Sequence, residues 1–395
     1  MKKILITFSQ IFYFLFYAQN NIPIIGFMGV SDKNASVINY KKMYASGINI
    51  SLMDFRDFNA AKKALNNANL ANVKLILMFP SALTNKSEIE QIKNHNALYG
   101  YYIADEPSLS EFSFFENRIL QIKRYDDTHL FYINLHPNHA PAKHLGTSNY
   151  AEYLEEFASK STVQFFSFDN YPVLGLKIRY EWYDNLELIR NISLKFKKPF
   201  WGFACTTIHD EYIKPTVAAI RLQQFSNLLY GAQGLQYFRY WGHTQQEMLK
   251  SKNIGYSIVD DQGNPTPTYN IVKKVNLQIQ RLAWVFFGAN SDKVYHTGTE
   301  IPEGTSKLIS VPKGFKYFST NGKNALVSLM SNGKNRFVII QNKSLNNNIT
   351  LDYQLGEPMK IVDNFSGKTK NISSTKKLKA SILPGDVLIF NSNNN

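Results

Sequence analysis

Eight short apolar runs separated by stretches of helical length constrain the fold of this chain more than any other feature. Each run is nearly continuous in apolar residues, as expected of parallel strands that are covered on both faces. The runs are Ile24–Val30, Ile48–Phe55, Val73–Phe79, Leu98–Ala104, Leu130–Leu135, Val163–Phe168, Pro199–Ala204 and Leu235–Tyr240. Helical periodicity fills the gaps, for example in Trp182–Phe196 and Val217–Leu229. Eight strand–helix repeats predict an α/β fold, a closed (β/α)8 TIM barrel.

The pattern changes near the end of the barrel region. After a long helix at about Thr268–Phe287 the chain shows short β runs with turn signals such as Asn332-Gly333 and Pro384-Gly385, which predict a small C-terminal β-sandwich. We therefore expect a barrel over residues 22–290 and a β-sandwich over residues 291–392. An open, doubly wound sheet is the alternative fold, but no glycine-rich phosphate loop follows the first run.

The first residues have the layout of a secretory signal. Lys2 and Lys3 precede the apolar run Ile4–Phe16, and cleavage is expected after Ala18, so residues 1–18 form the predicted signal peptide. No later apolar stretch is long enough to span a membrane. Cys205 is the only cysteine, which excludes an intrachain disulfide. These features predict a secreted or periplasmic bacterial protein.

The distribution of charge and of possible metal-binding residues argues against nucleic acids and metal ions as partners. The net charge is +14, but the lysines are dispersed and no Arg-rich run is present, so we expect no nucleic-acid partner. The excess of positive charge instead suits weak attraction to an acidic polysaccharide or an anionic envelope surface. No spacing of His, Cys and carboxylate residues indicates a metal site, and no cofactor is expected.

Two runs end in carboxylates. In a (β/α)8 barrel the catalytic groups sit where the strands end, because the loops there share one face. The fourth run ends in Asp105-Glu106-Pro107 and the sixth in Asp169-Asn170-Tyr171-Pro172. Burial beside Asp105 should raise the pKa of Glu106. Glycoside hydrolysis needs one protonated carboxyl and one anionic group, so we predict Glu106 as general acid/base and Asp169 as nucleophile or base.

Other side chains at the strand ends are candidates for binding substrate. They are Asn134, Tyr171, His209, Tyr237, Arg239 and Trp241. Trp241 and Tyr237 suit stacking on a sugar ring, and core packing is the alternative for both. Arg239 lies in an apolar strand, where we expect its charge to meet the carboxylate of Asp169 or Glu106. For Asp105-Glu106-Pro107 and Asp169 the alternatives are a helix N-terminus and a turn.

Three segments resemble secreted barrel glycosidases of gut and environmental Bacteroidetes, near the retaining clan A that includes the barrel β-galactosidases. The segments are Tyr101–Pro107, Asp169–Pro172 and Tyr230–Phe238, within a resemblance that spans residue 23 to about 390. It implies an acid/base Glu at the end of strand four, which Glu106 matches. In that clan an Asn precedes this Glu, whereas Asp105 stands here. The clan's nucleophile is a Glu at the end of strand seven, and Trp201–Cys205 offers none.

This departure leaves two mechanisms open. Asp169 can supply the second carboxylate of a retaining or inverting glycosidase, with Asp210 and Glu211 as fallback nucleophiles. Alternatively, Asp105-Glu106 resembles the pair of substrate-assisted hexosaminidases, in which the Asp orients a 2-acetamido nucleophile and the Glu is the acid. Both predict a glycoside hydrolase with an oligo- or polysaccharide substrate. A non-catalytic glycan-binding barrel is the alternative from another class.

Overall fold

The computed structural model describes residues 21–79, 85–175, 177–179, 181–250, 253–373 and 376–393. The predicted signal peptide lies outside these residues. Within the described ranges, no helix has both the length and the apolar character needed to cross a membrane.

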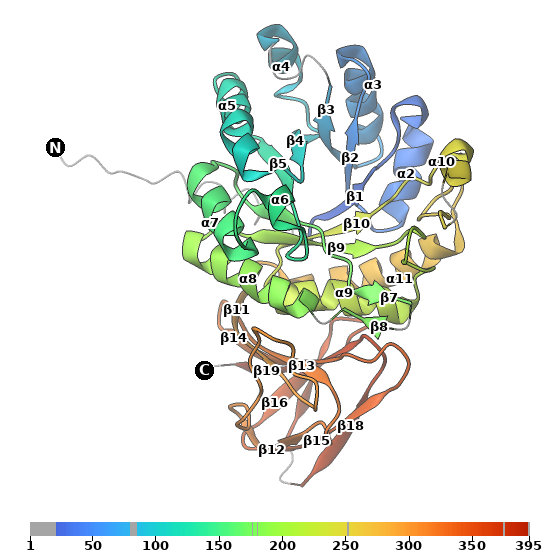
Figure 1. Ribbon diagram of the computed structural model, residues 1–395. Coiled ribbons are helices and arrows are strands. Elements are labelled where there is room, and N and C mark those ends of the chain that lie inside the picture. The colour runs from blue at the N-terminus through green and yellow to red at the C-terminus, as the bar shows by residue number, and fades with distance from the viewer. Residues whose placement is uncertain are drawn as a thin grey trace, which may run out of the picture.

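Eight parallel strands close into a barrel in the order β1-β10-β9-β6-β5-β4-β3-β2 (Figure 1). Each predicted apolar run contains or overlaps one of these strands, so the predicted fold class is confirmed. The strands are β1 (Ile24–Phe27), β2 (Ile50–Asp54), β3 (Lys74–Met78), β4 (Leu98–Asp105), β5 (Leu130–Leu135), β6 (Phe166–Phe168), β9 (Phe200–Cys205) and β10 (Gly234–Phe238).

Helices alternate with the strands and surround the barrel (Figure 1). They are α2 (Val37–Ala45), α3 (Phe58–Asn69), α4 (Lys86–Ile92), α5 (Phe112–Lys123), α6 (Ala142–Leu145), α7 (Tyr150–Lys160), α8 (Glu181–Phe196), α9 (Val217–Leu229), α10 (Gln245–Lys250), α11 (Pro267–Arg281) and α12 (Ala283–Phe286), with short 3-10 helices η1 (Asp32–Asn34) and η2 (Leu109–Glu111). Side-chain caps fix several starts: Asp57 accepts the N–H of Ala60, and Thr216 accepts that of Ala219. A small hairpin, β7 (Val173–Leu174) and β8 (Lys177–Ile178), follows β6.

Two antiparallel sheets follow the barrel, as predicted for the C-terminal part of the chain. One sheet contains β11 (Asn290–His296), β13 (Ala325–Asn332), β14 (Asn335–Asn342), β19 (Val387–Asn393), β16 (Met359–Val362) and β17 (Thr369–Ile372) in that order. The other contains β12 (Phe315–Ser319), β15 (Ile349–Leu355) and β18 (Leu378–Ile382). A shared apolar core that includes Ile340, Leu351 and Phe390 lies between them. This part of the chain is a β-sandwich.

The sandwich packs against α9 of the barrel (Figure 1). Every residue of α9 from Ala219 to Leu229 is buried. The Ser226 hydroxyl donates to Oε1 of Gln341 at 2.6 Å, and the Gln341 amide donates to the carbonyl of Leu222 at 3.0 Å. Hydrogen bonds of this kind across a buried interface fix the orientation of the sandwich relative to the barrel.

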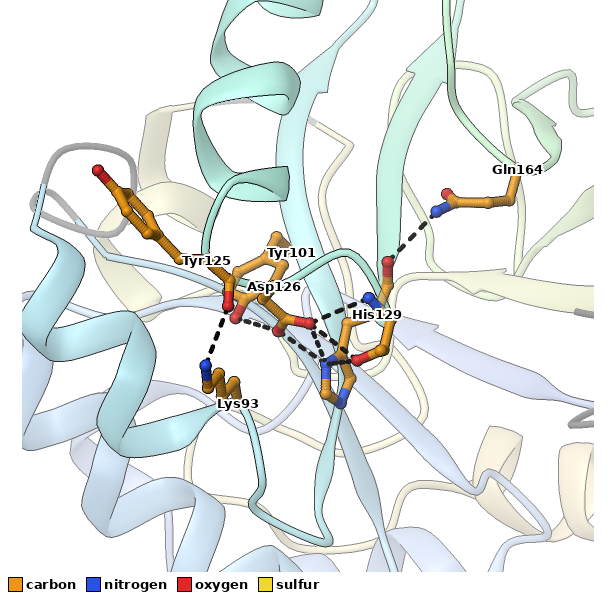
Figure 2. Close-up of polar contacts among 7 residues, drawn as sticks. Lys93, Tyr101, Tyr125, Asp126, His129 and Gln164 are labelled. Carbon is orange, nitrogen blue, oxygen red and sulfur yellow. Dashed lines mark hydrogen bonds and ion pairs between the residues drawn. The ribbon is translucent and has the colours of Figure 1, made fainter. Parts of the chain in front are cut away.

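A buried carboxylate stabilises the turn between α5 and β5. This turn lies at the N-terminal ends of the barrel strands, opposite to the face that carries Glu106. Asp126 is 3% exposed. The Tyr101 hydroxyl donates to its Oδ2 at 2.7 Å, and Nδ1 of His129 lies 2.7 Å from the same oxygen. Figure 2 shows both side chains pointing toward the Asp126 carboxylate. Burial alone would raise the pKa of Asp126, but the hydrogen bond and charge of His129, aided by Tyr101 and Thr128, lower it to about 2.

We expect Asp126→Asn to lower the free energy of unfolding at pH 7 by about 2 kcal/mol. Because the folded state lowers the pKa of Asp126, this stability is present above the unfolded pKa, near 4, and is lost as the pH falls toward 2. Urea denaturation at pH 7 measures the difference. The matched control is Asp127→Asn, which changes the exposed neighbouring carboxylate. Equal stability of the two variants would contradict this role of Asp126.

Candidate active site

The predicted acid lies at the point where β4 ends. Asp105 is the last residue of β4 and pairs in register with Asn134 of β5. Glu106 follows, and its N–H donates to the carbonyl of Asn134 at 2.8 Å. Its φ of 47° lies in the left-handed region, which costs a residue with a side chain about 1–3 kcal/mol and is enriched at functional sites. The side chain of Glu106 is 40% exposed, so a substrate can reach its carboxylate.

A chain of hydrogen bonds through the barrel interior holds Asp105. The Tyr132 hydroxyl donates to Oε1 of Gln236 at 2.6 Å, and the Gln236 amide donates to Oγ of Ser167 at 2.9 Å. Ser167 in turn donates to Oδ1 of Asn134 at 3.0 Å. This leaves the Asn134 amide to donate to Oδ1 of Asp105 at 3.1 Å. The chain fixes the orientation of Asn134, and through it that of the Asp105 carboxylate.

Glu106 and Asp169 are brought into direct contact. Asp169 follows β6, and its Oδ2 accepts the Tyr171 hydroxyl at 3.2 Å. The side chains of Asp169 and Glu106 lie close enough to interact, and the interaction lowers the pKa of Glu106 and raises that of Asp169. Burial raises the pKa of Asp169, and the charges of Glu106 and Asp105 raise it further. Of the two groups, Asp169 is therefore the one that favours the protonated form.

The pKa of Glu106 moves in the opposite direction to the prediction. A hydrogen bond from His136 is the largest influence and lowers the pKa, against the effect of burial. Nδ1 of His136 lies 3.5 Å from Oε2 of Glu106. Burial does raise the pKa of the adjacent Asp105, although the hydrogen bond from Asn134 opposes it. The predicted raised pKa of Glu106 is wrong because His136, after β5, faces it.

Two of the predicted binding residues lie beside the carboxylate pair. The Tyr171 ring stacks on Phe238 with 5.6 Å between ring centroids. The His209 ring meets Phe238 edge-on at 5.3 Å and Tyr171 at 6.3 Å. Asn134 is only 2% exposed, so its place in the structure is to position Asp105. Glu211, a fallback nucleophile, forms an ion pair with Arg179 at 2.8 Å.

Tyr237 and Trp241 do not reach this face. In β10 Gln236 and Phe238 point into the barrel, so by alternation Tyr237 points toward the helices. Tyr237 is fully buried, and its hydroxyl donates to Oδ1 of Asn276 on α11 at 2.6 Å. Trp241 is 5% exposed, and its indole N–H donates to the carbonyl of Asp261 at 3.2 Å. The prediction that these two residues bind substrate is wrong, and the core-packing alternative describes both.

The guanidinium of Arg239 has other partners than those predicted. Its Nε donates to the carbonyl of Trp241 at 2.7 Å, and one terminal nitrogen donates to the carbonyl of Gly242 at 3.3 Å. The other terminal nitrogen lies 3.0 Å from Nδ1 of His243. The predicted partners, Asp169 and Glu106, both hydrogen-bond elsewhere. The expectation that one of them neutralises Arg239 is wrong.

Several residues of the site were not predicted to act there. They are His136, Tyr132, Ser167 and Gln236. Ser167 and Gln236 carried a usable signal, because each is a polar residue inside an otherwise apolar strand. Burial raises the pKa of the Cys205 thiol to about 12, so it is no thiolate nucleophile at neutral pH. Across the described residues, no cluster of three His, Cys, Asp or Glu residues could hold a metal ion.

Known proteins resemble this chain in fold but not in sequence. No family model matches the chain, and no curated protein matches it. A glycoside hydrolase family 5 protein from Bacteroides vulgatus is similar in structure, with a TM-score of 0.57 at 11% sequence identity over 94% of this chain and 88% of that chain. The chain shares the fold of this protein.

Two further solved structures share this fold. A cycloisomaltooligosaccharide glucanotransferase from Paenibacillus has a TM-score of 0.53 at 8% identity and covers 94% of this chain and 83% of its own. A GH27 β-L-arabinopyranosidase from Geobacillus stearothermophilus has a TM-score of 0.50 at 10% identity, over 95% and 97% of the two chains. Since these likenesses extend over both the barrel and the sandwich, the two-part architecture is shared as well. At such low identity they show the architecture alone.

Proposed function

We propose that the protein is a glycoside hydrolase that cleaves an oligo- or polysaccharide, with Glu106 as general acid/base. The observation that carries this proposal is the pairing of two carboxyl groups, Glu106 and Asp169, at the face where the barrel strands end. The fold, shared with a glycoside hydrolase family 5 protein and a GH27 arabinopyranosidase, supports it. We also propose a secreted or periplasmic location, supported by the signal-like residues 1–18.

Glu106 and Asp169 together supply the proton that the reaction needs. Asp169 favours the protonated form in the free protein, and Glu106 is the partner that solvent and substrate reach. Transfer of this proton from Asp169 to Glu106, and from Glu106 to the glycosidic oxygen, provides the acid step. The hydrogen bond from His136 then stabilises the Glu106 carboxylate that remains. Asp105, held by Asn134, is placed to bind a hydroxyl or 2-substituent of the sugar.

The contact between the two carboxyl groups favours substrate assistance as the mechanism. Two carboxylates that attack and protonate the same sugar stand about 5 Å or more apart, because the reacting carbon lies between them. Glu106 and Asp169 interact directly in the free protein, which leaves little room between them for a sugar. A 2-acetamido group of the substrate, oriented by Asp105, would supply the nucleophile in place of Asp169. A retaining or inverting mechanism with Asp169 requires the pair to separate when substrate binds.

Paired 4-nitrophenyl glycosides test the function and the mechanism together. Each sugar is offered with a 2-hydroxyl and with a 2-acetamido group, beside a panel of plant and host polysaccharides. We expect turnover of at least one substrate, and substrate assistance predicts that only 2-acetamido sugars are cleaved. Folded protein that binds these glycans without cleaving any would overturn the proposal in favour of a glycan-binding barrel.

A further inference from the structure

Arg239 carries a positive charge that forms no ion pair with a carboxylate among the described residues. It follows β10 and is half-buried, and burial lowers its pKa, with the charge of Glu247 opposing this. The acceptors around its guanidinium are two backbone carbonyls and one imidazole nitrogen. Among the described residues, no Asp or Glu forms an ion pair with it. A half-buried charge held only by neutral acceptors is costly unless a binding partner compensates it.

His243 adds a second donor beside Arg239. Burial and the charge of Arg239 lower the pKa of His243 to about 4, so the ring is neutral at pH 7. A guanidinium only donates, so Nδ1 of His243 must accept and Nε2 must carry the hydrogen. Nε2 is buried, and it has no hydrogen-bond partner in the described part of the chain. Two guanidinium N–H groups of Arg239 beyond the three in use are therefore left for a ligand, and the hydrogen bond to His243 holds the guanidinium in place.

Contacts connect these donors to the catalytic pair. Arg239 directly follows Phe238, whose ring stacks on Tyr171. Tyr171 in turn donates to Asp169. His209 contacts Phe238, and the charge of Arg239 contributes to the lowered pKa of His209. The Arg239–His243 pair therefore belongs to the same face as Glu106 and Asp169.

We propose that Arg239 and His243 form a subsite for an anionic substituent of the glycan, a carboxylate or a sulfate group, so that the substrate is an acidic saccharide. This inference rests on the proposed function. A planar guanidinium matches the paired oxygens of carboxylate and sulfate, and a charge-assisted bond to it discriminates strongly against an uncharged sugar. The net charge of +14 supports accumulation of such a substrate near the protein.

The test compares matched substrates that differ in one charged group. The pairs are 4-nitrophenyl glucoside with glucuronide and galactoside with galacturonide, and 6-sulfated sugars form a separate arm that distinguishes sulfate from carboxylate. Wild type should favour the anionic member of at least one pair about 10- to 100-fold in kcat/KM. Arg239→Gln should remove that preference, and Arg239→Lys should restore part of it. Equal kcat/KM for charged and neutral members in the wild type overturns the proposal without reference to any variant.

A matched control separates the subsite from the general positive charge. Arg336 is exposed on the sandwich and likewise donates to two backbone carbonyls, those of Gly333 and Asn335. Arg336→Gln removes the same charge and should keep the wild-type preference within about twofold, because surface charges are screened by salt. A loss of preference as large as that of Arg239→Gln would overturn the proposal.

A measurement of sugar binding distinguishes failure of this inference from failure of the proposed function. Titration calorimetry with glucuronate, galacturonate and their neutral parent sugars measures affinity where no hydrolysis occurs. Preferential binding of the anionic sugars without turnover supports the subsite and overturns the hydrolase. Turnover of neutral glycosides with no preference for anionic ones supports the hydrolase and overturns the subsite.

Discussion

Glu106→Gln is expected to lower kcat about 10³-fold on any glycoside that the wild type cleaves. The amide keeps the size of the side chain but cannot deliver a proton to the leaving oxygen, and general acid catalysis supplies about 10²- to 10⁴-fold in rate. The free energy of unfolding should stay within about 1 kcal/mol of wild type, because the side chain is 40% exposed. Steady-state kinetics and urea denaturation measure the two effects. Turnover close to that of wild type would exclude Glu106 as the acid.

Asp169→Asn is the companion variant, because it removes the second carboxyl group and leaves Glu106 in place. In the wild type the raised pKa of Asp169 should extend activity toward high pH, since the pair keeps one proton there. Without Asp169, Glu106 must hold the proton alone, and His136 lowers its pKa. The alkaline limb of the kcat/KM profile should therefore move to lower pH. An unchanged limb would show that Asp169 does not supply the proton.

Arg221→Ala is expected to destabilise the protein by about 3–5 kcal/mol, the largest stability effect that we predict. Arg221 of α9 is 4% exposed, and its guanidinium lies 3.2 Å from Oδ2 of Asp386 in the sandwich. Its Nε donates to Oε1 of Gln278 at 3.0 Å, and the Gln278 amide donates to Oδ1 of Asp386 at 2.8 Å. Burial raises the pKa of Asp386 and Arg221 lowers it, so removal of Arg221 leaves a carboxylate buried without its cation.

A double-mutant cycle separates the ion pair from the packing of the Arg221 stem. Removal of both charges in Arg221→Ala with Asp386→Ala should cost less than the sum of the two single changes, because neither charge is then left unpaired. Urea denaturation of the four proteins gives the coupling free energy. Strict additivity would show that the pair contributes no interaction across the interface.

The barrel could be predicted from the sequence because parallel strands buried on both faces leave near-continuous apolar runs. The same periodicity places Glu106 at a strand end, because its run stops one residue before Asp105. The sequence also contained the information needed to orient the side chains of β10, since they alternate between the two faces of the strand. The polar Gln236 among apolar residues marks the inward face. Applied to Tyr237, it would have placed that ring among the helices.

The protonation of the site could not be predicted in the same way. The hydrogen bond of His136 to Glu106 joins residues from the loops after β4 and β5, and its geometry depends on the left-handed backbone at Glu106. Likewise, direct contact between Glu106 and Asp169 depends on how far two loops extend over the barrel. Sequence spacing identifies the strand end that carries each group, whereas pKa values depend on contacts of a few ångströms.

The burial of α9 from Ala219 to Leu229 has a consequence for the order in which the chain matures. The sheet that covers this helix ends with β19, the last strand of the chain. At roughly 5–20 residues per second, that strand leaves the ribosome on the order of ten seconds after α9. Until β19 has been synthesised, the sheet that covers α9 is incomplete. The barrel and the sandwich can therefore complete their shared core only once the whole chain has been made.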